Sequence, residues 1–156
     1  MHKVQPDLGA LIAWNLDNGE KRIQFVNGMA ANDPVSTLQI WKFVIDRYPG
    51  EGGTCVFFNS RDDRPIRTRQ MIELTLKEIK PDHFIIRGDK LQSTLNRLAY
   101  HSPTTKIQTI GLNDDIGSTV EMLVGLPHDT LIYAIGNQVG AGQEILTQIS
   151  KYRHYG

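Results

Sequence analysis

The chain has 156 residues, of which 40% are apolar and 22% charged, and this length suits one domain with its own hydrophobic core. Its 17 basic and 17 acidic side chains leave a formal net charge of zero, which excludes a global field that attracts nucleic acid or an anionic membrane, so any anion site must be local. The single cysteine, Cys55, excludes a disulfide framework within the chain, and no apolar run reaches the ~20 residues of a membrane span.

The first elements predicted are two strands joined by a tight turn. Residues 10–14 and 22–27 are apolar or alternating, and Asp17-Asn18-Gly19 between them is typical of a hairpin turn. A helix should start at Asn32-Asp33-Pro34, where a polar side chain can cap the first turn and proline costs no hydrogen bond. One face of this helix is apolar and carries Leu38, Trp41, Val44, Ile45 and Tyr48, before residues 49–53 end it.

Strands and helices alternate along the rest of the chain. The predicted strands are residues 54–59, 83–87, 106–110 and 130–135. Two predicted helices span residues 65–80 and 143–152. A short helical segment between them carries Leu91, Leu95, Leu98 and Ala99 on one face. Another is capped at Asn113-Asp114 and carries Ile116, Val120, Leu123 and Val124. This order predicts an α/β fold whose mostly parallel sheet is covered by helices on both faces.

Three polar segments follow predicted strands, at residues 27–33, 59–69 and 137–142. In open parallel sheets, ligands bind beyond the carboxyl ends of the strands. We therefore expect the three segments to face one rim of the sheet, where they would form a binding site.

The segment 59–69 carries the strongest chemical signal of the chain. It contains Arg61, Arg64, Arg67 and Arg69, interleaved with Asp62 and Asp63, just before a predicted helix. Arginine holds carboxylate or phosphate through two parallel hydrogen bonds, and a helix start adds main-chain N–H donors. The alternative is a solvated turn whose surface ion pairs each contribute only about 0–1 kcal/mol.

The other two segments carry weaker signals. Residues 27–33 combine small side chains with amide and carboxylate groups, although Asp33 could simply cap the following helix. The glycine-rich residues 136–142 could approach a ligand closely or could serve only tight helix–strand packing. Their late position and their G-x-x-x-G-x-G spacing argue against a nicotinamide site.

Several common sites are missing from the sequence. No G-x-x-x-x-G-K-[ST] run occurs, so the chain has no phosphate-binding loop with its lysine. The five histidines are scattered without metal-ligand spacing, and we expect no metal site. The sequence also lacks a hydrolase nucleophile elbow and a basic stripe for nucleic acid.

Four segments resemble the ligase subunit of poly-γ-glutamate synthases, a family of the Mur ligase superfamily. Residues 25–41 are similar to its F-V-N-G-x-A-A-N-D-x-x-S-T-L-x-I-W run, and residues 59–70 to its N-x-R-x-D-R-x-x-R-T-x-Q run. Residues 135–137, with Gly140 and Ala141, resemble its G-N-x-x-G-A element, and residues 6–10 its P-D-x-G-A segment. The order and the spacing agree across nearly the whole chain.

The resemblance covers only the C-terminal domain of that family. It implies a Rossmann-like three-layer sandwich with an N-terminal β-hairpin, with residues 11–156 as a single domain and residues 1–10 as a linker from a central domain. In the family, ATP activates the γ-carboxylate of the growing chain as an acyl phosphate, which the amine of an incoming glutamate attacks. The C-terminal domain closes over the central ATP-binding domain, so we expect this chain alone to be inactive and to bind no cofactor, with ATP and magnesium belonging to the complete enzyme.

The resemblance also implies roles for ten residues. Arg61, Arg64 and Arg67 would clamp glutamate carboxylates, with Asp63 orienting them and Asn59 beside them. The cleft near the phosphates or ribose would be lined by Asn27, Asn32, Asp33, Gly136 and Asn137. No catalytic residue and no metal ligand are expected. Gly28 and Ala30 stand where many relatives carry an acidic residue or a lysine, so those roles do not transfer.

The implied partners are the central ATP-binding domain, glutamate, the γ-glutamyl chain and membrane subunits of the synthase, with no nucleic acid. This implies a location at the cytoplasmic face of the membrane, and the first six residues lack the apolar core of a signal peptide. Two other readings stay open. The chain could be a free-standing Rossmann-like module for a small anion or nucleotide, or a domain whose rim docks a partner subunit.

Overall fold

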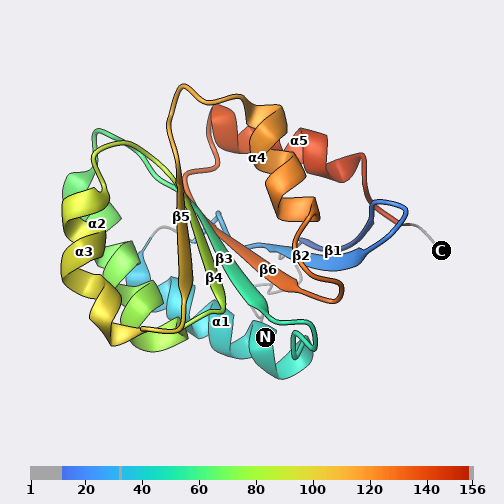
Figure 1. Cartoon of the computed structure of the whole chain (residues 1–156), viewed down its shortest axis with the longest axis horizontal. Helices are drawn as coiled ribbons and strands as arrows, with labels where there is room; N and C mark the ends of the chain where they lie inside the picture. Colours follow the sequence, from blue (N-terminus) through green and yellow to red (C-terminus); the bar gives the residue numbers. More distant parts are fainter. Residues whose placement is uncertain (1–11, 32, 155–156) are drawn as a thin grey trace, which may run out of the picture.

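The computed structural model describes residues 12–31 and 33–154, which form one six-stranded sheet in the order β1-β2-β6-β3-β4-β5. Only β1 is antiparallel to its neighbour, and every other pairing is parallel. Helices α1, α2 and α3 lie on one side of the sheet and α4 and α5 on the other (Figure 1). The prediction of a three-layer, mostly parallel α/β sandwich with an N-terminal hairpin is confirmed. The predicted linker, residues 1–10, lies outside the described residues.

The hairpin pairs β1 (Ile12–Asp17) with β2 (Arg22–Asn27). Strand β1 extends to Asp17, so the prediction that it ends at residue 14 was wrong. The physical reason is alternation, because polar Asn15 points outward while Leu16 is buried in the core. The turn is held by Asn18, whose Oδ1 accepts hydrogen bonds from the main-chain N–H groups of Glu20 and Lys21.

Helix α1 (Pro34–Arg47) begins as predicted, because Asp33 caps it. The Asp33 Oδ1 accepts a hydrogen bond from the Ser36 N–H at 2.8 Å, and its Oδ2 accepts one from the Ser36 hydroxyl at 3.0 Å. Trp41 and Val44 are buried against the sheet. The chain then enters β3 (Thr54–Asn59), which lies at the predicted residues.

The sequence predicts one regular helix over residues 65–80, but the α-helix α2 (Pro65–Leu74) ends earlier. Its last turn is a π-helix, η2 (Thr75–Ile79), in which the Thr75 hydroxyl donates to the Met71 carbonyl at 2.9 Å. The turn closes with the Lys80 N–H donating to the Thr75 carbonyl at 2.8 Å, and Lys80 adopts a left-handed conformation with φ of 49°.

The remaining elements are β4 (His83–Arg87), α3 (Gln92–Leu98), a 3₁₀ turn η3 (Ala99–His101), β5 (Lys106–Ile110), α4 (Ile116–Val124), β6 (Leu131–Gly136) and α5 (Ala141–Ser150). The cap of α4 is Asp115 instead of the predicted Asn113-Asp114. Its carboxylate accepts from the Ser118 N–H at 3.1 Å, whereas the Asp114 carboxylate accepts from the Gly111 N–H in the preceding turn. Helix α5 starts two residues before the predicted position and ends at residue 150.

Alternate residues of the central strands build a separate core on each face of the sheet. In β3, Cys55 and Phe57 pack toward α4 and α5, while Val56 and Phe58 pack toward α1, α2 and α3. Cys55 is fully buried among apolar side chains, and burial raises the pKa of its thiol. Among the described residues, no helix is both long and apolar enough to cross a bilayer.

The strand order decides which polar residues meet at the rim of the sheet. Strand β6 lies between β2 and β3, so Gly136 at the end of β6 is in register with Asn59 at the end of β3. Asn59 is in turn in register with Arg87 at the end of β4. The loops that follow these strand ends are therefore neighbours in space.

Candidate functional site

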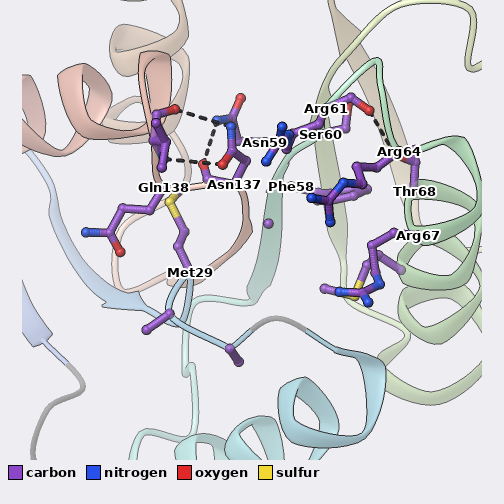
Figure 2. Close-up of a pocket in the computed structure, with 15 residues that line it drawn as sticks. Met29, Phe58, Asn59, Ser60, Arg61, Arg64, Arg67, Thr68, Asn137 and Gln138 are labelled. Atoms are coloured by element: carbon purple, nitrogen blue, oxygen red, sulfur yellow. Dashed lines mark hydrogen bonds between the residues drawn. The ribbon is translucent and has the colours of Figure 1, made fainter.

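A pocket of about 500 Å³ opens at this rim (Figure 2). It is lined by residues 29–31 after β2, by residues 58–61 at the end of β3, by residues 64, 67, 68 and 71 at the start of α2, and by residues 136–139 at the end of β6. The expectation that three separated polar segments face one rim is confirmed. Parallel strands bring their carboxyl ends together, which explains why segments over 100 residues apart share one pocket.

The floor of the pocket is apolar. Met29, Phe58 and Met71 line it and are almost fully buried. The β2 loop can reach this position because its first residue is Gly28, where a Cβ atom would overlap the Tyr133 ring. That ring is held by a hydrogen bond from the Tyr133 hydroxyl to the Thr37 carbonyl at 2.9 Å, and burial raises the pKa of Tyr133.

The walls of the pocket are basic. Arg61, Arg64 and Arg67 line it, and no carboxylate does so among the described residues. Arg64 and Arg67 extend from the start of α2 toward Asn137 and Gln138 on the opposite side (Figure 2). Arg64 directly precedes Pro65, the first residue of α2, and Arg67 lies in the first turn, so both side chains leave the same end of the helix. The pocket therefore carries a concentrated positive charge that the net charge of the chain does not reveal.

Arg61 differs from the other two arginines because it has an internal partner. Its Nε and Nη2 atoms donate to the two carboxylate oxygens of Asp63 at 2.9 and 2.8 Å. The hydrogen bond from Arg61 is the main reason that the pKa of Asp63 lies below its usual value. Both side chains are solvent-exposed, so water screens this pair and its geometry matters more than its strength. Asp63 does not line the pocket but orients Arg61.

In the described part of the chain, Arg64 and Arg67 make no ion pair. Arg67 lies near enough to Asp33 to lower the pKa of that carboxyl slightly, behind the larger effect of the Ser36 hydrogen bonds. Two guanidinium groups are thus free to bind an anion with several oxygen atoms.

Asn59 and Asn137 join the ends of β3 and β6. The Asn59 Nδ2 donates to the Asn137 carbonyl at 2.8 Å, and the Asn137 N–H donates to the Asn59 carbonyl at 2.8 Å. Gly136 is required between them because its φ is 102° and a Cβ atom would overlap the Asn59 carbonyl oxygen. The loop after β6 is therefore held in place before any ligand arrives.

The predicted cleft residues divide into two that line the pocket and two that do not. Asn27 is buried, and its Oδ1 accepts a hydrogen bond from the Met29 N–H at 3.0 Å, which shapes the loop. Asp33 caps α1, and neither Asn27 nor Asp33 lines the pocket. Gly136 and Asn137 do line it, on the side facing the arginines. Asn32 lies outside the described residues.

The sequence analysis missed Arg87. This residue ends β4 and is buried beneath the rim, where its Nη1 donates to the Asn59 Oδ1 at 3.3 Å and its Nη2 donates to the Leu112 carbonyl at 2.6 Å. The available signal was an arginine at the end of the apolar strand His83–Arg87, since strands buried on both faces rarely carry a charge.

A second recess of about 310 Å³ adjoins the pocket on the other side of the α2 start and shares Ser60, Arg61 and Thr68 with it. Its charge is mixed, because Arg69 and Lys90 line it together with Asp62 and Asp89. This mixture distinguishes it from the acid-free pocket.

The residues present fit a phosphate or carboxylate group better than a metal ion. Within residues 12–31 and 33–154, no three His, Cys, Asp or Glu side chains form a group that could hold a metal. Magnesium prefers carboxylate and phosphate oxygens, and the pocket lining offers no carboxylate. Magnesium held with ATP would therefore need ligands from outside this pocket.

Comparison with known proteins gives a consistent result. The family described as "Poly-gamma-glutamate synthase CapB C-terminal domain" matches residues 14–152. The chain is 32% identical over 159 residues to the PGA synthase CapB of Bacillus subtilis (strain 168), covering 98% of this chain and 39% of that protein. It is also 32% identical over 152 residues to the capsule biosynthesis protein CapB of Bacillus anthracis, covering 96% of this chain and 32% of that protein. The chain thus spans only about a third of the length of these relatives.

The fold is shared with a solved Mur-type enzyme. A crystal structure of a murein peptide ligase from Psychrobacter arcticus 273-4 superimposes with a TM-score of 0.57, over 87% of this chain and 29% of that chain. At 12% sequence identity this likeness concerns the fold alone. The family match over 14–152 and the agreement with both CapB proteins together establish that the chain belongs to the poly-γ-glutamate synthase CapB C-terminal domain family.

Proposed function

We propose that this domain binds substrate and closes over the ATP-binding part of an amide ligase that polymerises glutamate into poly-γ-glutamate. The observation that carries the proposal is the acid-free pocket at the carboxyl rim, in which Arg61, Arg64 and Arg67 converge. Membership of the CapB C-terminal domain family supports the reaction class.

The chemistry of the pocket suits a γ-glutamyl group. Each glutamate unit combines carboxylate with two methylene groups, which matches arginine walls above a floor of Met29, Phe58 and Met71. The guanidinium groups of Arg64 and Arg67 would bind the carboxylates through paired hydrogen bonds, while the methylene groups cover the apolar floor. Arg61, already oriented by Asp63, would form the third contact.

In this proposal the residues of the domain bind and orient, and they do not react. ATP supplies the activation of the carboxylate in the complete enzyme. The arginines hold the substrate's charge, and the loop at Gly136 and Asn137 forms the side of the pocket that faces them. Holding two reactants in a fixed geometry lowers the barrier to their reaction by reducing its entropy cost.

The surface around the pocket supports the closure part of the proposal. Val35, Ile66 and Val139 are large apolar side chains that are 67%, 65% and 75% exposed. Val35 and Ile66 lie in the first turns of α1 and α2, at the rim, and Val139 lines the pocket. Exposed apolar groups around a polar site suit contact with another protein surface. We propose that this surface is the ATP-binding part of the ligase, and that the complete ligase works with membrane subunits at the cytoplasmic face of the membrane.

Titration calorimetry on the 156-residue chain tests the proposal with glutamate, a short γ-glutamyl peptide and ATP as ligands. We expect the γ-glutamyl peptide to bind and Arg64→Ala to abolish its binding. Binding of ATP alone, with no response to either glutamyl ligand, would instead favour a free-standing nucleotide-binding module and would contradict the proposal. The chain by itself should neither hydrolyse ATP nor join glutamates, because it contains no phosphate-binding loop.

A further inference from the structure

Arg87 is a buried cation with no acidic partner among residues 12–31 and 33–154. It is only 6% exposed, at the end of a strand whose preceding residues Phe84, Ile85 and Ile86 are fully buried. A buried arginine is normally paired with a carboxylate, because removing its charge from water is costly. The ion pairs within the described residues are Arg61 with Asp63, Lys77 with Glu73, and His128 with Asp129, and none of them includes Arg87.

The hydrogen bonds of Arg87 do not by themselves explain the choice of a guanidinium group. Nη1 and Nη2 bind two neutral oxygens, on Asn59 and Leu112, while Nε has no partner. A smaller neutral donor would hold either oxygen without placing an uncompensated charge in the interior. Hydrogen bonding alone therefore does not account for the positive charge of Arg87.

Arg87 does not line the pocket, but it hydrogen-bonds to Asn59, which does. The Asn59 amide is 1% exposed, and its oxygen accepts from Arg87 while its nitrogen donates to the Asn137 carbonyl. With the cation against the oxygen, the amide must present its NH₂ group to Asn137, because the flipped amide would bring NH₂ against the guanidinium. Arg87 thus determines the orientation of the side chain that holds the pocket loop.

Arg87 also positions the exit of β3 through its main chain. The Arg87 carbonyl accepts hydrogen bonds from the Ser60 N–H at 3.0 Å and from the Ser60 hydroxyl at 2.9 Å. Gly88 follows this contact, and a Cβ atom there would overlap the Ser60 hydroxyl in its present position. Ser60 lines the pocket and directly precedes Arg61. The end of β4 therefore supports both the glycine-rich loop and the arginine-bearing turn.

We propose that Arg87 is a positioning residue of the basic pocket: it fixes the Asn59 amide and the β3 exit, and its unneutralised charge increases the affinity of the pocket for anions. A bound anion would supply the negative charge that the described interior lacks, and buried charges interact more strongly than charges in water. The inference rests on the proposed function only in needing an anionic ligand in this pocket, and it does not require that ligand to be glutamate.

Three variants of the 156-residue chain test this role: Arg87→Lys, Arg87→Gln and, as a control, Arg97→Gln, which removes an exposed arginine on α3. Calorimetry would measure binding of inorganic pyrophosphate and of a γ-glutamyl peptide at low and at high salt. We expect Arg87→Gln to weaken pyrophosphate binding about tenfold at low salt, with a smaller loss for Arg87→Lys, which keeps the charge. Arg97→Gln should bind as the parent chain does.

A second measurement separates positioning from general stability. In NMR spectra, the Asn59 side-chain NH₂ signals should shift in Arg87→Gln and less in Arg87→Lys. The main-chain spectrum should stay unchanged away from the ends of β3 and β4 and from the loops at Leu112 and Asn137. A variant that unfolds more easily but binds pyrophosphate normally when folded would overturn the proposal, because Arg87 would then serve stability alone. So would equal losses for Lys and Gln at every salt concentration, or a parent chain that binds no pyrophosphate.

The two proposals fail in different ways. If pyrophosphate binding depends on Arg87 but no γ-glutamyl peptide binds, the substrate assignment is wrong and the role of Arg87 stands. If the peptide binds through Arg64 but is insensitive to Arg87, the substrate assignment stands and the positioning role is wrong.

Discussion

Asn59 and Asn137 are tied to each other twice, by the Asn59 Nδ2 donating to the Asn137 carbonyl and by the Asn137 N–H donating to the Asn59 carbonyl, both at 2.8 Å. These two hydrogen bonds connect the ends of β3 and β6, so one wall of the basic pocket is built by the fold itself. Binding in a preformed pocket avoids the entropy cost of ordering a loop.

Asn59→Ala should lower the free energy of unfolding by roughly 1–3 kcal/mol, because it leaves the buried Nη1 of Arg87 and the carbonyl of Asn137 without partners. Asn96→Ala is the matched control, since the exposed Asn96 only accepts a hydrogen bond from Gln92. That control should stay within about 0.5 kcal/mol of the parent chain in urea denaturation. Equal effects of the two substitutions would contradict the importance of the buried amide.

Gly136→Ala should be strongly destabilising because of both its backbone conformation and a close contact. Substitution of Gly19, which shares only the conformation, separates the two effects. Gly136 has a φ of 102°, and a methyl group there would overlap the Asn59 carbonyl, whereas Gly19 has a φ of 97° with open space around it. Gly19→Ala should cost about 1 kcal/mol for its backbone conformation alone. Gly136→Ala should cost roughly 3 kcal/mol or more in thermal or urea unfolding, and a cost no greater than that of Gly19→Ala would show that the close approach is tolerated.

Arg64→Ala in a complete ligase that contains this domain should impair the use of glutamate more than the use of ATP. Loss of one charge-assisted pair costs about 1.5–3 kcal/mol, which corresponds to a loss of roughly 10- to 150-fold in kcat/KM for glutamate. Arg97→Ala, on the exposed side of α3, is the control and should leave both parameters unchanged. A loss confined to the affinity for ATP would assign Arg64 to the nucleotide instead.

The cap of α1 predicts a defined pH dependence. The Ser36 hydrogen bonds lower the pKa of Asp33 below its ordinary value of 3.8, so the folded state favours the ionised carboxylate. The stabilisation is therefore present above that ordinary value and is lost as the pH falls through the lowered folded-state pKa. Asp33→Asn keeps a capping oxygen without titrating. The stability of the parent chain relative to Asp33→Asn should fall with decreasing pH in this acidic range, and a constant difference would refute the linkage.

Local patterns predicted most elements, and their errors have local causes. Strands β3, β4 and β5 lie at the predicted residues because short apolar or alternating runs bounded by turn residues permit little else. The predicted end of β1 was wrong because Asp17 suits a turn as well as a half-buried strand position. The π-turn at Thr75–Ile79 left no signal, because the same apolar face serves either helix type.

The pocket residues also divide into those that the sequence predicted and those that it did not. Charge singled out four arginines, and the family resemblance selected three of them, Arg61, Arg64 and Arg67, which line one pocket. The fourth, Arg69, lines the neighbouring recess instead. Met29, Phe58 and Met71 were missed as its floor, because in a sequence the apolar lining of a pocket is identical to core. Arg87 was missed because its contacts are with Asn59, Ser60 and Leu112, which are distant in sequence.

The sequence by itself determined the alternation of strands and helices, the Asp33 cap of α1, and the presence of guanidinium groups after one strand. Only the tertiary structure decided that β6 lies between β2 and β3. That insertion sets Gly136 and Asn137 beside Asn59, opposite arginines more than 60 residues earlier in the chain. The physical reason is that periodicity reports which face of an element is buried, whereas the choice of neighbouring strand depends on packing between segments that are distant in sequence.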